Sequence, residues 1–131
     1  MPLLFNFDWR YFCNAKSQYI RNALAQAIGT SQYWKVFPDF LITDDVKIMV
    51  ELCEANWLIT EIFLLSRNEK VRKEDFVVWK LALNSTSAVL SADDGNYHEF
   101  IRKEIPFTDF PMSEGISLYW CDNVLLLPTE Y

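Results

Sequence analysis

The side chains best suited to chemistry in this chain are three cysteines, one histidine and two pairs of adjacent aspartates. A metal site is disfavoured, because His98 is the only histidine and no two cysteines have the spacing of metal ligands. A Cys–His nucleophile would have to bring His98 against one of the cysteines. Cys53 falls on an apolar helix stripe and Cys121 beside an expected turn, as packing cysteines do. We therefore expect no catalytic residue, no metal and no cofactor.

The paired carboxylates have structural explanations. Asp44 and Asp45 fall in the first turn of an expected helix, where the helix dipole favours anions. Asp93 and Asp94 precede Gly95 in an Asp-Gly turn between two expected strands. The three glycines are isolated, so they cannot form a phosphate-binding loop. These patterns favour a protein that is not an enzyme.

The negative charge of the chain is concentrated in its C-terminal part. Acids outnumber Lys and Arg by 18 to 12, and the formal net charge is −6. Residues 75–131 hold nine acids and three Lys or Arg, whereas the connector 67–74 is net basic. This balance does not favour direct nucleic-acid binding. These acids either form an ordinary solvated surface, or they imitate phosphates and bind a basic, nucleic-acid-handling protein partner.

The candidate interface follows from the absence of Lys and Arg after residue 103. Five acids lie there, together with two phenylalanines that either fill the core or serve as interface anchors, Phe107 and Phe110. The candidate interface residues are Glu104, Asp109, Phe110, Glu114, Asp122 and Glu130.

The spacing of apolar residues predicts an α+β fold, with two main helices followed by an antiparallel meander of four or five strands. Helices are expected over residues 9–28 and 43–66, the second with Thr43 as N-cap, and the segment 29–38 is expected to form a short helical turn. The period becomes two from Phe76 onward. Strands are expected over 76–83, 88–92, 97–105, 116–121 and 124–127.

The composition predicts a single domain over residues 1–131 with a large core, because 51% of residues are apolar and 16% are aromatic. We expect no signal peptide and no membrane span, since the apolar start lacks a basic region and charged residues interrupt the longest apolar helix. The odd, widely spaced set of cysteines predicts reduced thiols in a cytoplasmic protein.

Two other functions stay open at this point. A small-molecule-binding domain or small enzyme would use a pocket between helices and sheet, lined by Trp34, Trp57, Trp79 and Tyr97. A structural subunit would instead form a homodimer through an exposed strand edge.

Several short motifs follow one another after residue 28. They are T-D-D-V-K at 43–47, W-L-I at 57–59, F-T-D-F-P at 107–111 and L-L-L-P-T-E-Y at 125–131. On these motifs, residues 29–131 resemble an uncharacterised bacterial family, a domain of unknown function known from cyanobacteria and Bacteroidetes and often carried on mobile elements. Residues 1–28 lie outside the resemblance, and we expect them to be a variable helical segment. The mobile-element setting implies a phage- or plasmid-encoded inhibitor or accessory factor, for example of the anti-CRISPR kind.

Overall fold

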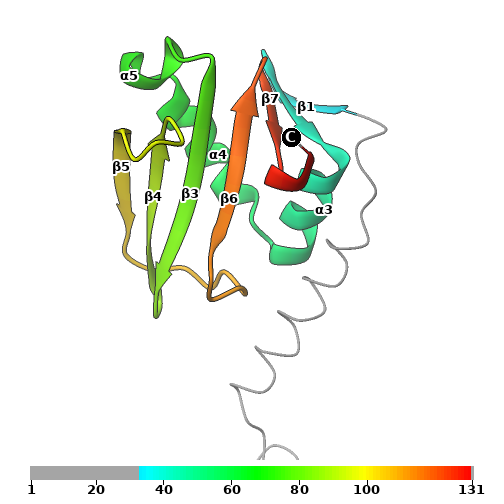
Figure 1. Ribbon diagram of the computed structural model, residues 1–131. Helices are drawn as coiled ribbons and strands as arrows, with labels where there is room; N and C mark the ends of the chain where they lie inside the picture. The colour runs from blue at the N-terminus through cyan, green and yellow to red at the C-terminus, as the bar shows by residue number, and fades with distance from the viewer. Residues whose placement is uncertain (1–32, 131) are drawn as a thin grey trace, which may run out of the picture.

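The computed structural model describes residues 33–130, which form a seven-stranded sheet with helices packed on one face (Figure 1). This confirms an α+β fold, with more strands than expected. The helix expected over residues 9–28 lies outside the described residues. The strands are β1 (Tyr33–Phe37), β2 (Phe40–Thr43), β3 (Phe76–Asn84), β4 (Ser87–Asp93), β5 (Glu99–Ile105), β6 (Ile116–Cys121) and β7 (Val124–Leu126). The helices are α3 (Asp44–Cys53), α4 (Asn56–Ser66) and α5 (Glu69–Arg72), and a 3-10 turn, η1, spans Pro128–Glu130.

The sheet is not the simple meander that we expected. Its strand order is β1-β2-β7-β6-β3-β4-β5, and β2 runs parallel to β7 with Leu41 opposite Val124. The other pairs are antiparallel. Because β1 and β2 precede α3, α4 and α5, the prediction that two helices come before the whole sheet was wrong. The three residues of β7 join this early hairpin to the C-terminal strands.

The segment before Pro38 forms strand β1, so the helical turn expected there was wrong for the described residues. Pro38 and Asp39 make the turn into β2, and Asp39 has a left-handed φ of 57°. Pairing with β1 provides hydrogen-bond partners for the backbone amides and carbonyls on the edge of β2 that faces away from β7. The indole Nε1 of Trp34 donates a hydrogen bond to Asp44 Oδ1 at 2.7 Å, which ties β1 to the start of α3.

The single helix expected over 43–66 is two helices, α3 and α4. Thr43 caps α3 as predicted, because its Oγ1 accepts the amide hydrogen of Val46 at 3.2 Å. The helix ends where Glu54 adopts a φ of 53° and the Ala55 amide donates to the Val50 carbonyl oxygen at 2.9 Å. One straight helix over these residues would be about 36 Å long, against about 30 Å for the nine-residue β3. The break therefore lets both helices pack their apolar sides on the sheet.

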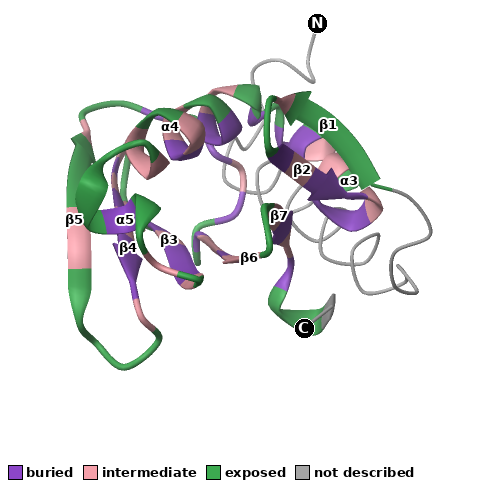
Figure 2. Ribbon diagram, turned by 90° about the horizontal axis from the view of Figure 1, so that it is seen from above, coloured by how far each residue is buried: buried purple, intermediate pink, exposed green. Residues whose placement is uncertain are grey.

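The core lies between the sheet and the helices, as the buried segments in Figure 2 show. Val77, Trp79 and Leu81 of β3 are buried on the helix-facing side, as the period of two predicted. The strands expected from residue 76 onward are all present, with shifted ends. No helix within residues 33–130 is both long and apolar enough to cross a membrane.

Candidate functional site

The predicted interface residues do not form one patch. Glu104 is the next-to-last residue of β5, and Asp109 and Glu114 lie in the connection from β5 to β6. All three are exposed, and Figure 1 shows that this connection runs along one end of the sheet. Asp122 lies in the β6–β7 turn, at the other end of β6 and about 20 Å away along the strand. Glu130 belongs to η1, and its side chain lies outside the described part of the chain.

The two phenylalanines of this region occupy different environments. Phe110 is only 6% exposed and belongs to the core, so the prediction that it is part of the interface was wrong. Its amide donates to Thr108 Oγ1 at 3.2 Å, which turns the chain inward at this point. Phe107, which we did not include in the candidate interface, is 72% exposed. The aromatic side chain available to a partner is therefore Phe107.

The connection that carries Phe107 is fixed to the sheet at several points. The Thr108 amide donates to the Thr86 carbonyl oxygen in the β3–β4 turn at 2.7 Å. Gly115 lies so close to β3 that an added Cβ would be 1.9 Å from the Leu81 carbonyl oxygen. We call the exposed group at this end the acidic loop surface, which consists of Glu104, Phe107, Asp109 and Glu114.

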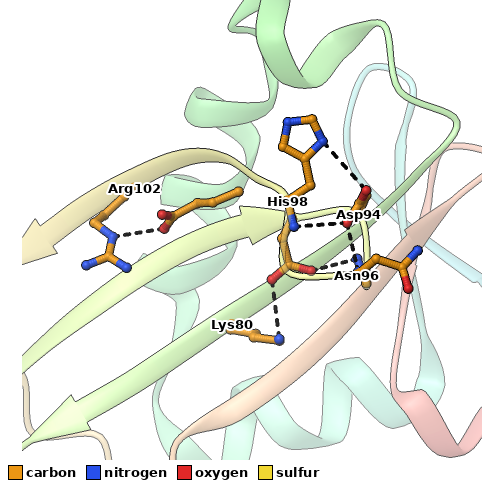
Figure 3. Close-up of polar contacts among 8 residues, drawn as sticks. Lys80, Asp94, Asn96, His98 and Arg102 are labelled. Atoms are coloured by element: carbon orange, nitrogen blue, oxygen red, sulfur yellow. Dashed lines mark hydrogen bonds and ion pairs between the residues drawn. The ribbon is translucent and has the colours of Figure 1, made fainter.

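The aspartates of the β4–β5 hairpin stabilise the turn (Figure 3). Asp93 is buried and forms an ion pair with Lys80, in which Lys80 Nζ lies 3.3 Å from Asp93 Oδ2. Asp94 Oδ1 accepts the amide hydrogens of Asn96 and His98 at 2.7 and 3.2 Å. The Asn96 amide first, and then the amide and charge of His98, hold the pKa of Asp94 below its ordinary value. Within residues 33–130, no group of three His, Cys, Asp or Glu could hold a metal ion.

The four aromatic residues expected to line a pocket do not come together. Trp79 is 1% exposed in the core, whereas Tyr97 is 94% exposed at the β4–β5 hairpin. Trp34 is exposed on β1, and Trp57 is half-buried on α4. The prediction of a pocket from these residues was wrong, because they belong to separate elements that face in different directions.

A cavity does lie between helices and sheet, at the end of the molecule where α4 leads into α5. Its volume is about 530 Å³, which is within the range of small-molecule sites. Three aromatic rings line it: Phe40 of β2, Phe63 of α4 and Trp120 of β6. The ring centroid of Phe40 lies 4.8 Å from that of Trp120 and 5.8 Å from that of Phe63.

Two cationic side chains, Arg67 and Arg72, line the same cavity. The guanidinium carbon of Arg67 lies 5.9 Å from the ring centroid of Phe63. Residues 33–130 contain three arginines, and only Arg102 forms an ion pair there, with its Nε 2.8 Å from Glu99 Oε1. The sequence predicted a pocket between helices and sheet as an alternative but assigned other aromatic residues to it, because the lining comes from separate segments of the chain. The net-basic connector 67–74 was the signal for the arginines.

The comparisons with known proteins identify a family and no activity. Neither the curated proteins nor the solved structures gave a match. A family of unknown function, DUF6876, matches residues 18–131, so the match begins before the region 29–131 that the motifs marked. The resemblance to an uncharacterised family is confirmed, and the chain belongs to the DUF6876 family of unknown function.

Proposed function

We propose that this protein is a small interaction module without catalytic activity, which binds a basic protein partner through the acidic loop surface. The observation that carries the proposal is Phe107, a large apolar side chain that is 72% exposed on a fixed connection. Protein interfaces draw most of their binding energy from a few such anchors surrounded by polar groups.

The fixed shape of the connection supports binding without rearrangement. Thr108 is hydrogen-bonded to the β3–β4 turn, and Phe110 and Met112 are buried in the core. Gly115 holds the chain against β3. Ordering a loop on association costs free energy, so a loop that is already held in place binds more tightly.

The charge around Phe107 indicates the kind of partner. Glu104, Asp109 and Glu114 are exposed at the same end of the sheet, and no Lys or Arg follows residue 103. Carboxylates arranged in this way attract a basic surface and speed the encounter with it. A surface that normally binds phosphates has this character, so our proposed partner is a nucleic-acid-handling protein.

The role that suits such binding is that of an inhibitor or accessory factor. An acidic protein that occupies a phosphate-binding surface competes with nucleic acid for it. Origin from a phage or plasmid and action in the cytoplasm are parts of the same proposal.

The test is affinity capture at low salt from cells that naturally make the protein, with bound proteins identified by mass spectrometry. The bait variants are Phe107→Ala and, as a control, Tyr97→Ala, which removes an even more exposed aromatic ring elsewhere. We expect a basic partner on the wild-type and Tyr97→Ala baits, and at least about tenfold less of it on Phe107→Ala. Equal capture by both variants, or no basic partner on any bait, would contradict the proposal.

A further inference from the structure

We infer that the cavity between α4, α5 and the sheet binds a small aromatic anion with the size and polarity of a mononucleotide. This site is separate from the acidic loop surface. Trp120 lies near the end of β6 that leads to β7, whereas Glu114 lies before the other end of that strand. The two sites therefore lie toward opposite ends of the molecule.

The aromatic side chains provide a surface on which a planar ring can stack. Phe40 is buried at 2% exposure, whereas Phe63 and Trp120 are only half-buried and line the cavity with it. Phe63 also stacks on Phe37, with the ring centroids 4.1 Å apart and the planes 12° apart, which fixes its orientation. Phe37 covers one face of Phe63, so a planar ring would meet the exposed parts of Phe63 and Trp120, in offset or edge-to-face geometry.

The arginines supply the charge for an anionic group. Neither Arg67 nor Arg72 forms an ion pair within the described residues, although the chain carries 18 acids. A guanidinium group binds phosphate or carboxylate through two parallel hydrogen bonds. The position of Arg67 by the Phe63 ring places this charge beside the stacking surface.

Two turns contribute hydrogen-bonding groups to the same cavity. Asp39 of the β1–β2 turn and Asn123 of the β6–β7 turn both line it. The amide of Leu41 donates to the Asn123 carbonyl oxygen at 2.9 Å, so the two turns are joined. The Asp39 carboxylate disfavours a bare anion but accepts hydrogen bonds from hydroxyl or ring amino groups. This set of groups fits a ligand that carries a heteroaromatic ring and hydroxyls as well as its anionic group.

The first experiment is isothermal titration calorimetry of the full chain with AMP, adenosine and inorganic phosphate. We expect saturable binding of AMP, with adenosine at least about tenfold weaker because it lacks the charge that the arginines would bind. Inorganic phosphate should bind more weakly than AMP by at least the same factor, because it lacks the ring. Absence of AMP binding at millimolar concentration, or equal affinity for AMP and phosphate, would overturn the inference.

The second experiment assigns the binding to this cavity. Arg67→Gln/Arg72→Gln removes both arginines that line it, and Lys70→Gln/Lys73→Gln removes the same charge from neighbours that do not. All four side chains are exposed, so we expect both variants to fold, which thermal unfolding checks. AMP affinity should fall at least about tenfold in the arginine variant and less than about threefold in the lysine variant. Similar affinities in the two variants would overturn the assignment.

Discussion

A single residue, Gly115, controls the shape of the acidic loop surface. Its φ of 74° lies in the left-handed region that favours glycine. The atom nearest to an added Cβ would be a backbone atom, the carbonyl oxygen of Leu81. A side chain at this position would push the connection away from β3. Phe107 would then lose the fixed position on which the proposed binding depends.

We therefore predict that Gly115→Ala lowers the free energy of unfolding by about 2–4 kcal/mol, since it adds a backbone clash to conformational strain. Urea denaturation measures the loss. Gly95→Ala is the matched control, because Gly95 has a φ of 86° but an added Cβ would meet no atom closer than 3.7 Å. That control should lose only about 1 kcal/mol. Equal losses in the two variants would show that the contact with Leu81 has no energetic role.

The burial of Phe110 and the exposure of Phe107 could not be predicted from the sequence. The motif at 107–111 left open whether its two phenylalanines fill the core or serve as interface anchors. The structure buries Phe110 and exposes Phe107. This arrangement depends on Thr108, whose amide donates to the Thr86 carbonyl oxygen in another part of the chain and whose hydroxyl accepts the Phe110 amide hydrogen. A contact between residues 86 and 108 has no local signal in the sequence.

Among the helices and strands, the break between α3 and α4 differs most clearly from the prediction, which was a single helix. Thr43 is an ordinary N-cap and could be predicted from its residue type. Helix ends in the left-handed conformation usually carry glycine, and here the residue is Glu54, with a φ of 53°. The helix ends there because each half packs separately on the sheet, which the apolar spacing alone did not indicate.

Glu54→Gly should stabilise the protein by about 0.5–1 kcal/mol, because glycine adopts the left-handed conformation without steric cost. Thermal or urea unfolding measures the change. Glu54→Ala serves as the control, since it removes the same carboxylate from the helix end but keeps the strain. Its effect should stay within about 0.5 kcal/mol. If the glycine variant were no more stable than the alanine variant, strain at Glu54 would not be the cause.

The two terminal strands of the described sheet differ in character. β5 carries charged side chains along most of its length, as edge strands that avoid pairing do. β1 exposes Tyr33, Trp34 and Val36 and has Lys35 as its one charge. We propose that β1 pairs with the β1 strand of a second copy. An antiparallel pair centred on Lys35 would place the two lysines opposite each other, so the association should be weak and strengthened by salt.

Sedimentation velocity at increasing protein concentration tests this pairing. We expect a monomer–dimer equilibrium for the wild type and a shift to monomer for Val36→Lys, because an added charge on an edge strand opposes pairing. The matched control is Leu64→Lys, which places the same charge on an exposed apolar residue of α4, away from the edge. A wild-type protein that stays monomeric at the highest concentration would exclude the dimer.

The two candidate sites lie toward opposite ends of the molecule. The acidic loop surface lies at one end of the sheet, and the cavity with Arg67 and Arg72 lies where α4 leads into α5 (Figure 1). The sequence indicated this separation in part, because the basic connector 67–74 and the acidic C-terminal region are distinct segments. It could not show that Phe40, Phe63 and Trp120 meet, since that depends on the parallel pairing of β2 with β7.

Site-specific photo-crosslinking at the acidic loop surface tests whether Phe107 contacts a basic protein in the cell. Phe107 is replaced by benzoyl-phenylalanine, and the same substitution at Tyr97 provides a control, since both positions are exposed aromatics. After irradiation of cells that naturally make the protein, we expect a discrete adduct with a basic protein from position 107 and none from position 97. No adduct at position 107, or the same adducts from both positions, would contradict the proposal.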